Sequence, residues 1–474
     1  MNRGSSHSSS KRIPLDREET IAAISTPFGE SGIGIVRISG PLAEPIAKKL
    51  FKPKKDQLCF VSHHFHYGEI IDSQSGKAVD EVLIVLMKSP KTYTREDIVE
   101  IHCHGGYFIL QKVLELVLKE GVRMAHPGEF TERAFLNGRI DLTQAEAVID
   151  LIRAKTQTSL EIANQQLRGW LYKEMADLRA QLFKHLVMIE AHIDFPEEEI
   201  APVAFGEMRK NLEIIIGRMK EWVDSYEEGR IFRDGISCAI VGKTNVGKSS
   251  LLNVLLRAER AIVTPIPGTT RDVIEEVVNI HGIPVRLMDT AGLRKPEDFI
   301  EQEGVRRAKE RVADSDIVLL MLDGSRALDA DDLEIFGEIN GKKRVVVINK
   351  KDLPVEVSYE EVKRRFDNDP IVSISALKKE GIDILKEAVY TSLVHREVRA
   401  TPEYLIVANI RHKTSLSQIR ESLCSATKGL EQGTPLEFIA FEIRSALEAL
   451  GELVGETTSE EVLNRIFEQF CIGK

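Results

Sequence analysis

The stretch of sequence that decides the fold is Gly242-Lys243-Thr244-Asn245-Val246-Gly247-Lys248-Ser249. It matches the pattern G-x-x-x-x-G-K-[ST], and it lies between the apolar run 237–241 and a stretch that begins Ser250-Leu251-Leu252. In this context glycines allow backbone N–H groups to wrap a phosphate chain, and the positive end of the following helix adds attraction. We expect Lys248 to reach the β- and γ-phosphates and the Ser249 hydroxyl to bind Mg²⁺.

Three further motifs follow strand-like runs, in the order that a guanine-nucleotide site requires. Asp289-Thr290-Ala291-Gly292 supplies a carboxylate for the magnesium shell and a backbone N–H for the γ-phosphate. Asn349-Lys350-Lys351-Asp352 supplies a carboxylate for the guanine N1–H and amine, which adenine does not offer, so ATP is rejected. Ser375-Ala376-Leu377 completes the loop on the base side. Together the motifs predict that GTP binds with Mg²⁺.

The surrounding sequence predicts a multidomain protein of class α/β plus α. Short apolar runs alternate with helical stretches in 236–394, which predicts an inserted Ras-like P-loop GTPase domain with a parallel sheet. Its strand candidates are 237–241, 285–289, 317–322, 345–349 and 371–375. Helical periodicity dominates 139–235 and 395–474, and we interpret these segments as the two parts of one discontinuous helical domain.

The N-terminal part of the chain has a different sequence pattern. Residues 18–138 mix strand-like runs, such as 33–38 and 82–86, with the helical stretch 108–120, so we expect an N-terminal α+β domain. Residues 1–17 are predicted to be a disordered tail, because they are polar and rich in serine.

Length, cysteine spacing, apolar runs and net charge limit the kinds of protein that this chain can be. A length of 474 residues suggests three domains at roughly 150 residues each. The five cysteines are widely spaced and form no Cys-x-x-Cys pair, which indicates a reducing compartment rather than disulfides or zinc. No apolar run approaches the roughly 20 residues that span a bilayer, so we predict a cytoplasmic protein without membrane contact. With a net charge of −10, RNA binding would need a local basic patch or a second protein.

Motifs outside the GTPase region indicate a family. They are the stretch 32–40 (GIGIVRISG), His104-Gly105-Gly106, the stretch 127–137 (PGEFTERAFLN) and the C-terminal Cys471-Ile472-Gly473-Lys474. With these motifs, residues 18–474 resemble the tRNA-modification GTPase family known as MnmE or TrmE. The resemblance implies a homodimer formed through the N-terminal domain, which binds a formyl-tetrahydrofolate derivative as one-carbon donor. The implied folate contacts are Arg37, Glu100, Arg139 and Lys474, although a lysine is common where this chain has Arg139.

The resemblance also implies a chemistry. The family acts with an FAD-dependent partner protein, as a heterotetramer, and installs an aminomethyl or carboxymethylaminomethyl group on carbon 5 of the wobble uridine of certain tRNAs. Cys471 is the implied functional cysteine, and its thiolate could add to the pyrimidine or its thiol could act as a general acid or base.

Leu293 stands where Ras-like proteins place the glutamine that orients the attacking water, so either hydrolysis is negligible or another group positions the water. Glu301 is the implied water-orienting residue, and the sequence alone does not distinguish it from Glu303. The resemblance implies K⁺ in place of an arginine finger, with Thr270 as a second magnesium ligand. The implied K⁺ ligands are Asn245 and backbone carbonyls of Thr264, Ile266 and Thr269.

The complete set of expected GTP-binding residues combines the motifs with the segment 264–270. They are Asn245, Val246, Gly247, Lys248, Ser249, Ser250, Thr264, Pro265, Ile266, Pro267, Gly268, Thr269, Thr270, Asp289, Thr290, Ala291, Gly292, Asn349, Lys350, Asp352, Ser375, Ala376 and Leu377.

Two other functions compete with the modification enzyme. One is a non-enzymatic switch, in which GTP controls assembly with a partner. The other is a ribosome-assembly GTPase, but such proteins usually carry a basic RNA-binding appendage, whereas Glu452, Glu456, Glu460 and Glu461 make this C-terminal region acidic.

Overall fold

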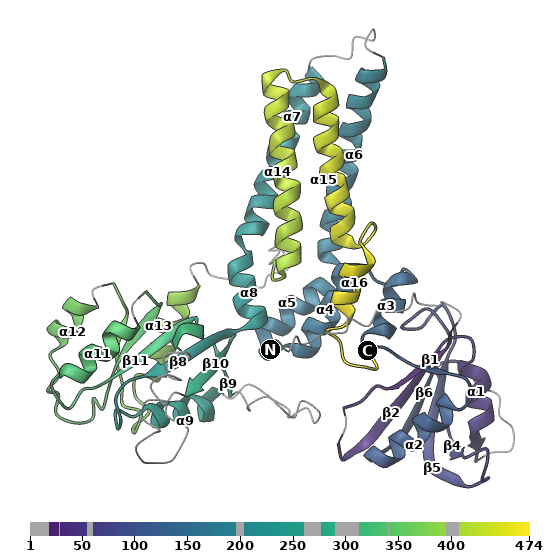
Figure 1. The fold of residues 1–474 in the computed structure, drawn as a ribbon, viewed down its shortest axis with the longest axis horizontal. Helices are drawn as coiled ribbons and strands as arrows, with labels where there is room; N and C mark the ends of the chain where they lie inside the picture. Colours follow the sequence, from purple (N-terminus) through teal and green to yellow (C-terminus); the bar gives the residue numbers. More distant parts are fainter. Residues whose placement is uncertain are drawn as a thin grey trace, which may run out of the picture. The chain divides into compact units, whose positions relative to one another are not determined.

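The structure is a computed structural model of the chain, shown in Figure 1. It describes residues 19–27, 29–54, 60–195, 203–259, 276–289, 312–339, 341–366, 368–394 and 407–474. The described chain forms two compact units, which are considered separately below. The first contains the residues up to Ile140 together with Ser459–Lys474, and the second contains the helical and GTPase regions.

The first unit is built on a seven-stranded sheet of order β3-β4-β5-β6-β2-β1-β7, in which only β1 and β7 pair in parallel. The strands are β1 (Ile21–Ile24), β2 (Ser31–Ser39), β3 (Phe51–Pro53), β4 (Phe65–Ile71), β5 (Ala78–Met87), β6 (Ile98–Gly105) and β7 (Arg123–Met124). Its helices are α1 (Ala43–Leu50), α2 (Tyr107–Leu118), α3 (Glu129–Leu136) and α16 (Glu460–Phe467).

The two faces of this sheet differ. One face packs its alternate strand residues against the buried faces of α1 and α2, so that Val36, Ile101 and Ile84, which pair across three strands, lie in one core. The opposite face carries Arg37 and Glu100, which pair across β2 and β6. Alternation along each strand therefore separates this core from the opposite face, on which Ile21 and Ala23 of β1 pack with Phe130 of α3 in a second buried cluster.

The segment 459–474 packs with the N-terminal residues rather than with the helical unit. Phe467 is fully buried, and Ile472 forms a β-bridge with Pro127. The sequence analysis placed these residues in the second helical segment, 395–474, because α16 continues the helical periodicity. Periodicity identifies a helix but does not identify the surface that it covers, so the packing differs from that boundary. The other predicted domain limits stay predictions.

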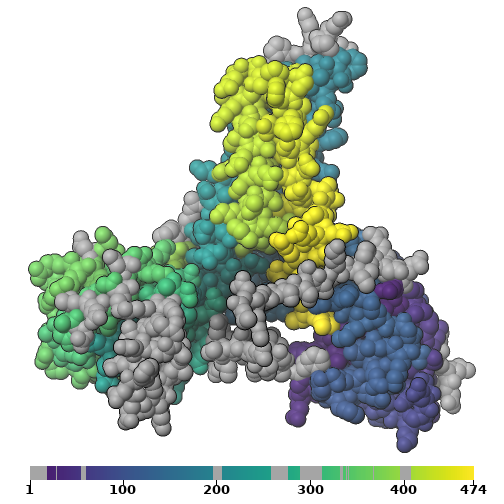
Figure 2. Space-filling view, viewed as in Figure 1, coloured from purple at the N-terminus to yellow at the C-terminus, as the bar shows by residue number. Residues whose placement is uncertain are grey.

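The second unit contains a bundle of long helices, which Figure 1 labels α6, α7, α14 and α15. In the space-filling view the teal and yellow segments, which are distant in sequence, lie against each other along the bundle (Figure 2). The helices of this region are α4 (Leu142–Arg153), α5 (Gln157–Leu167), α6 (Trp170–Asp194), α7 (Val203–Asp224), α8 (Tyr226–Asp234), α14 (Ile410–Gln432) and α15 (Leu436–Val454). Their buried apolar residues recur every three or four positions, as in Leu171, Met175, Leu178 and Leu182.

A buried polar cluster joins α4 to α14. The Glu146 carboxylate accepts hydrogen bonds from Arg411 Nε at 2.9 Å and Nη2 at 2.6 Å, and it lies 2.7 Å from His412 Nε2. Asn409 Nδ2 donates a further bond at 3.1 Å. Burial raises the pKa of Glu146, but the charges of His412 and Arg411 outweigh it and hold this pKa far below its ordinary value. The carboxylate therefore stays ionised inside the helical domain.

The GTPase region has a six-stranded sheet of order β13-β12-β11-β8-β10-β9, parallel except for the pairing of β9 with β10. Its strands are β8 (Ile236–Val241), β9 (Val277–Ile280), β10 (Ile283–Asp289), β11 (Ile317–Asp323), β12 (Arg344–Asn349) and β13 (Ile371–Ser373). Its described helices are α9 (Lys248–Glu259), α11 (Ala330–Glu338), α12 (Tyr359–Arg365) and α13 (Ile382–Leu393). The predicted fold class is confirmed.

Candidate functional site

The phosphate loop connects the central strand β8 to α9. Gly242 and Gly247 have φ values of 154° and 102°. A Cβ on Gly247 would lie 2.2 Å from Asn349 Nδ2, and one on Gly242 would lie 2.4 Å from the carbonyl oxygen of Met321. Glycine is required at both positions because the loop passes this close to β11 and β12.

Lys248, the first residue of α9, lies against this loop. Its Nζ donates hydrogen bonds to the carbonyl oxygens of Gly242 at 2.7 Å and Lys243 at 2.6 Å. Ser249 and Ser250 follow it in the first turn of the helix and are exposed. The start of α9 thus combines an ammonium group, a hydroxyl and the positive end of a helix, which are the groups that bind a phosphate chain and its metal ion.

Asn349 joins the phosphate loop to the base-side loop. Its Nδ2 donates to the carbonyl oxygen of Val246 at 2.8 Å, and its Oδ1 accepts from the backbone N–H of Ala376 at 3.0 Å. The side chain is buried, with 3% of its surface exposed. One amide therefore fixes the two loops that the sequence assigns to the two ends of GTP.

The carboxylate of Asp352, on the base side of the site, is fixed by a hydrogen bond and stays ionised. Ser375 Oγ donates to Asp352 Oδ1 at 2.5 Å, and this bond lowers the pKa of Asp352 below its ordinary value. The same hydroxyl accepts the backbone N–H of Lys378 at 3.1 Å, so its own direction is fixed. Leu377 at the tip of this loop is exposed.

The sequence analysis missed acidic residues that surround the site. Lys350, whose φ is 67°, donates from Nζ to Asp323 Oδ2 at 2.6 Å. Burial raises the pKa of Asp323, but bonds from Lys350 and Ser325 outweigh it, and the net effect lowers this pKa. Lys243 of the phosphate loop pairs with Asp329 and, at 3.3 Å, with Asp332. No local motif marks these residues, because each ion pair joins segments that are distant in sequence.

A second cluster lies in the first unit, on the sheet face opposite α1 and α2. Arg37 Nε donates to Glu100 Oε1 at 2.9 Å, and Arg37 Nη1 donates to the carbonyl oxygen of Gly473 at 3.3 Å. Burial raises the pKa of Glu100, but bonds from His102 and Arg37 outweigh it and lower this pKa. Burial and the nearby charge of Arg37 lower the pKa of Lys474.

An aromatic ring connects this cluster to Arg139. The guanidinium carbon lies 4.6 Å from the ring centre of Tyr93 for Arg139 and 5.9 Å for Arg37. Arg139 Nη1 also donates to the backbone carbonyl of Tyr93 at 3.2 Å. The structure therefore places all four predicted folate contacts in one unit, and two of them, Arg37 and Arg139, lie over a tyrosine that the sequence analysis did not name.

The C-terminal motif has a defined conformation. Gly473 has a φ of 94°, and a Cβ there would lie 2.3 Å from the carbonyl oxygen of Ile24. Cys471 beside it is exposed, whereas Cys103 and Cys238 are buried. An accessible thiol thus lies within three residues of Lys474.

Comparison with known proteins identifies the family. Residues 20–139 match the family model described as the GTP-binding protein TrmE N-terminus, and residues 142–471 match the MnmE helical domain. A tRNA modification GTPase MnmE from Geobacter sulfurreducens is 49% identical over 457 residues, which cover 96% of this chain and 99% of that protein. The chain belongs to the MnmE family of tRNA modification GTPases. This confirms the predicted family.

Other relatives of this MnmE-family chain are similar to a comparable extent. The tRNA modification GTPase MnmE of Carboxydothermus hydrogenoformans is 48% identical, with coverage of 96% of this chain and 100% of that protein. Among solved structures, Aquifex aeolicus Era bound to GDP and aluminium fluoride is 31% identical with a TM-score of 0.28, over 40% of this chain and 66% of that one. The T. maritima FeoB G domain is 26% identical with a TM-score of 0.26, over 33% and 98%.

Several predicted site residues of this MnmE-family chain lie outside the described residues. They are Thr264, Pro265, Ile266, Pro267, Gly268, Thr269, Thr270, Thr290, Ala291, Gly292, Leu293, Glu301 and Glu303. For Asp289 the structure gives the backbone, which ends β10 beside β8. Among the described helices, none combines the length and apolar composition needed to cross a bilayer.

Proposed function

We propose that this protein hydrolyses GTP and uses the nucleotide cycle to drive modification of tRNA, the activity for which its relatives are named. The observation that carries the proposal is the double hydrogen bond of Asn349, which fixes the phosphate loop relative to the base-side loop. Such a frame suits one ligand with a phosphate chain at one end and a base at the other.

Asp352 is the proposed guanine-specificity residue, and an altered base tests this role. Xanthine carries a carbonyl oxygen where guanine carries its amine. The side-chain N–H of Asp352→Asn could therefore donate a hydrogen bond to xanthine. Toward guanine, the same N–H would face the N–H of the amine, and no hydrogen bond could form. We expect Asp352→Asn to lose GTP hydrolysis and gain hydrolysis of xanthosine triphosphate, measured as phosphate release. Asp352→Ala is the control and should hydrolyse neither well. If Asp352→Asn keeps its preference for GTP, another residue reads the base.

The phosphate side is assigned to Lys248 and the first turn of α9. Lys248 would neutralise charge on the β- and γ-phosphates, and backbone N–H groups of the loop would bind their oxygens. Ser249, Thr270 and Asp289 would hold Mg²⁺, which when bound supplies Lewis-acid stabilisation of the phosphate charge. The exposed hydroxyl of Ser249, beside the Lys248 ammonium, fits this role.

We further propose that K⁺ stimulates hydrolysis. Asn245 lies in the phosphate loop with a φ of 63°, a conformation that asparagine tolerates and that leaves its exposed side chain outside the loop's own core. Its amide oxygen would hold the ion together with three backbone carbonyls, those of Thr264, Ile266 and Thr269. Glu301 would orient the attacking water in place of the missing glutamine.

The K⁺ proposal is tested by comparing rates of GTP hydrolysis in potassium chloride and in sodium chloride at equal ionic strength. Asn245→Gly is the informative variant, because glycine adopts the same backbone conformation and removes only the side chain. We expect stimulation by potassium in the wild type and its loss in Asn245→Gly. Equal wild-type rates in both salts would refute the K⁺ site, leave the GTP site intact and favour a GTP-dependent regulatory switch.

The first unit is the proposed site for the formyl-tetrahydrofolate derivative. Arg37, Arg139 and Lys474 offer positive charge for an anionic glutamate tail, and the Tyr93 ring positions the Arg139 guanidinium. The ionised Glu100 could accept hydrogen bonds from the pterin. Isothermal titration of the full-length protein with 5-formyltetrahydrofolate tests the site, and absence of binding would remove it without affecting the GTP site.

The same face of the sheet is the proposed homodimer interface. Tyr67 pairs with Leu83, and Leu83 pairs with His102, across three neighbouring strands. Phe65 lies two residues before Tyr67 on β4 and therefore on the same face of the sheet. Phe65, Tyr67 and Leu83 are 58%, 52% and 43% exposed, an unusual set of apolar side chains for a free surface. Sedimentation equilibrium should give a dimer, and Leu83→Glu should give a monomer.

The proposed modification installs an aminomethyl-type group at carbon 5 of the wobble uridine, with an FAD-dependent partner and a heterotetrameric assembly. Exposure of Cys471 in the first unit supports its role in that step, as a nucleophile or a proton donor. Nucleoside analysis of tRNA from cells that carry Cys471→Ser should show the loss of the modified uridine while GTP hydrolysis persists. Unchanged tRNA would exclude Cys471 from the chemistry.

A further inference from the structure

The phosphate loop has a conformation that needs support from outside the loop. Gly242, Asn245 and Gly247 have φ values of 154°, 63° and 102°. Such values lie outside the helical and strand regions that most residues adopt, and glycine loses more conformational freedom on folding than any other residue. Ordering this loop therefore costs entropy, and GTP binds more tightly if contacts within the protein order it before the nucleotide arrives.

The loop is held at two points, one on each side of its exposed residues 244–245. On the side of α9, the carbonyl oxygen of Val246 accepts the hydrogen bond from Asn349 Nδ2 at 2.8 Å. On the side of β8, the ammonium group of Lys243 pairs with two aspartates at the start of α11. The first contact connects the loop to the base side, and the second connects it to a helix that the sequence motifs do not include.

The two aspartates are themselves fixed by the backbone of α11. They are Asp329, which precedes the helix, and Asp332, whose Oδ2 lies 3.3 Å from Lys243 Nζ. Asp332 Oδ2 also accepts the backbone N–H of Asp329 at 3.2 Å, and Asp329 Oδ1 accepts the backbone N–H of Asp332 at 3.3 Å. Reciprocal bonds of this kind cap the first turn of a helix, so both carboxylates have a defined position.

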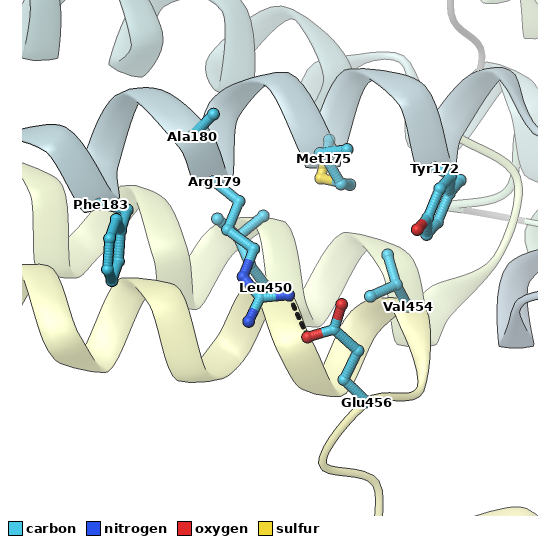
Figure 3. Close-up of a pocket in the computed structure, with 9 residues that line it drawn as sticks. Tyr172, Met175, Arg179, Ala180, Phe183, Leu450, Val454 and Glu456 are labelled. Atoms are coloured by element: carbon cyan, nitrogen blue, oxygen red, sulfur yellow. Dashed lines mark hydrogen bonds and ion pairs between the residues drawn. The ribbon is translucent and has the colours of Figure 1, made fainter.

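This anchor is buried, in contrast to a surface ion pair. The side chains of Lys243 and Asp332 are 10% and 5% exposed. Arg179 and Glu456, which pair across a pocket between α6 and α15, are 50% and 41% exposed (Figure 3). An exposed pair contributes little because water screens it, whereas the removal of one partner from a buried pair is strongly destabilising. Loss of one charge at Lys243 or Asp332 should therefore be felt by the loop.

The backbone of Lys243 connects the anchor to the ammonium group that is assigned to the phosphates. Lys248 Nζ donates to the carbonyl oxygen of Lys243 at 2.6 Å and to that of Gly242 at 2.7 Å. A displacement of Lys243 would therefore move the two oxygen atoms that hold Lys248 near the loop. The charge of Lys243 itself is matched by the two carboxylates, so its side chain fixes the loop and does not add a further cation for the phosphates.

We propose that Lys243 is a positioning residue of the GTP site. Asp329 and Asp332 hold its side chain, and through it they order the phosphate loop before GTP binds. The inference rests on the phosphate side of the proposed function, and it adds the contact that sets how tightly this side binds.

Neutralising Asp332 separates positioning from an effect of net charge. Asp332→Asn removes one negative charge beside a site for an anion, so electrostatics alone would tighten the binding of GTP. Loss of the anchor would weaken it, although the asparagine oxygen can still accept the N–H of Asp329. Lys243→Met removes the other partner, and Lys243→Arg keeps the charge. Glu361→Gln on α12 is the matched control, because it neutralises one carboxylate of an exposed pair with Arg365 in the same GTPase region.

The test measures the affinity of the full-length protein for GDP and for a non-hydrolysable GTP analogue by isothermal titration, and KM and kcat from phosphate release. We expect Asp332→Asn and Lys243→Met to weaken both nucleotides at least about tenfold, and to raise KM more than they change kcat. Lys243→Arg should stay within about threefold of the wild type, and Glu361→Gln within about twofold.

Unchanged or tighter binding of GTP by Asp332→Asn would overturn the anchor and leave the GTP site intact. Thermal unfolding of each variant without nucleotide shows whether it folds. If Asp332→Asn does not fold, the two variants of Lys243 decide, and equal affinities of Lys243→Met and Lys243→Arg would overturn the proposal. Absence of nucleotide binding by the wild type would instead refute the proposed GTP site itself.

Discussion

Removal of the Glu146 carboxylate should strongly destabilise the helical domain. Glu146 is 5% exposed and contacts Arg411, His412 and Asn409, so Glu146→Ala leaves the Arg411 guanidinium without its counter-charge and the buried His412 ring without its hydrogen-bond partner. Breaking a buried pair from one side costs about 3–5 kcal/mol. At roughly 2–4 °C per kcal/mol for a domain of this size, the melting temperature should fall by about 6–20 °C.

The assay is thermal unfolding followed by circular dichroism, with hydrogen–deuterium exchange to assign the transition to α4 and α14. Glu421→Ala on α14 is the control, because it removes the same group from an exposed position of the same domain. Glu146→Gln keeps the shape of the side chain and removes only its charge, so it should fall between the two. If Glu146→Ala melts within about 1 °C of Glu421→Ala, the cluster does not stabilise the domain and the reasoning is wrong.

The same carboxylate predicts a dependence on pH. The pKa of Glu146 is lower in the folded than in the unfolded state, where it lies near the ordinary value of about 4.3. Its contribution is therefore complete above about pH 4.3 and is lost as the pH falls from there toward the folded-state pKa. Between neutral pH and pH 3 the wild type should lose more stability than Glu146→Gln, and parallel curves would contradict the assignment.

Three further predictions concern the sites. Gly247→Ala should abolish GTP binding in a filter assay, because the new Cβ would lie 2.2 Å from Asn349 Nδ2 at a φ of 102°; retained affinity would mean that the loop adjusts. Tyr93→Ala should weaken binding of 5-formyltetrahydrofolate by about three- to thirtyfold, because Arg139 would lose the ring that positions its guanidinium, and an unchanged isotherm would place the ligand elsewhere. Iodoacetamide at pH 8 should label the exposed Cys471 and spare Cys238, whose pKa burial raises to about 12; mass spectrometry showing equal labelling would contradict the burial.

The sequence predicted the GTPase sheet better than it predicted the sheet's edge. The strand candidates coincide with β8, β10, β11, β12 and β13, because buried parallel strands are continuous apolar runs with a clear length. β9 was missed, although His281 and Gly282 have φ values of 48° and 90° and form the two-residue turn typical of a hairpin. A His-Gly pair is a weaker turn signal than Asn-Gly, and the strand has only four residues.

For the candidate sites, local motifs were predictable and long-range partners were not. Asn349 and Asp352 stand in a recognisable motif, so their positions could be read directly. Asp323 and Tyr93 depend on which loops meet in space, and no spacing rule in one sequence gives that. The association of 459–474 with the N-terminal unit is of the same kind, since it depends on buried contacts such as that of Phe467.

The bond between Arg37 and Gly473 has a consequence for synthesis of the chain. Its two residues are separated by 436 positions. At roughly 5–20 residues per second, a ribosome needs about 20–90 s after Arg37 to reach Gly473. During that time the sheet around Arg37 can fold, but Gly473 and Lys474, which lie beside Arg37 in the finished protein, have not yet been synthesised. Nascent chains therefore pass through a stage with a folded N-terminal sheet in which the proposed folate site still lacks its C-terminal residues.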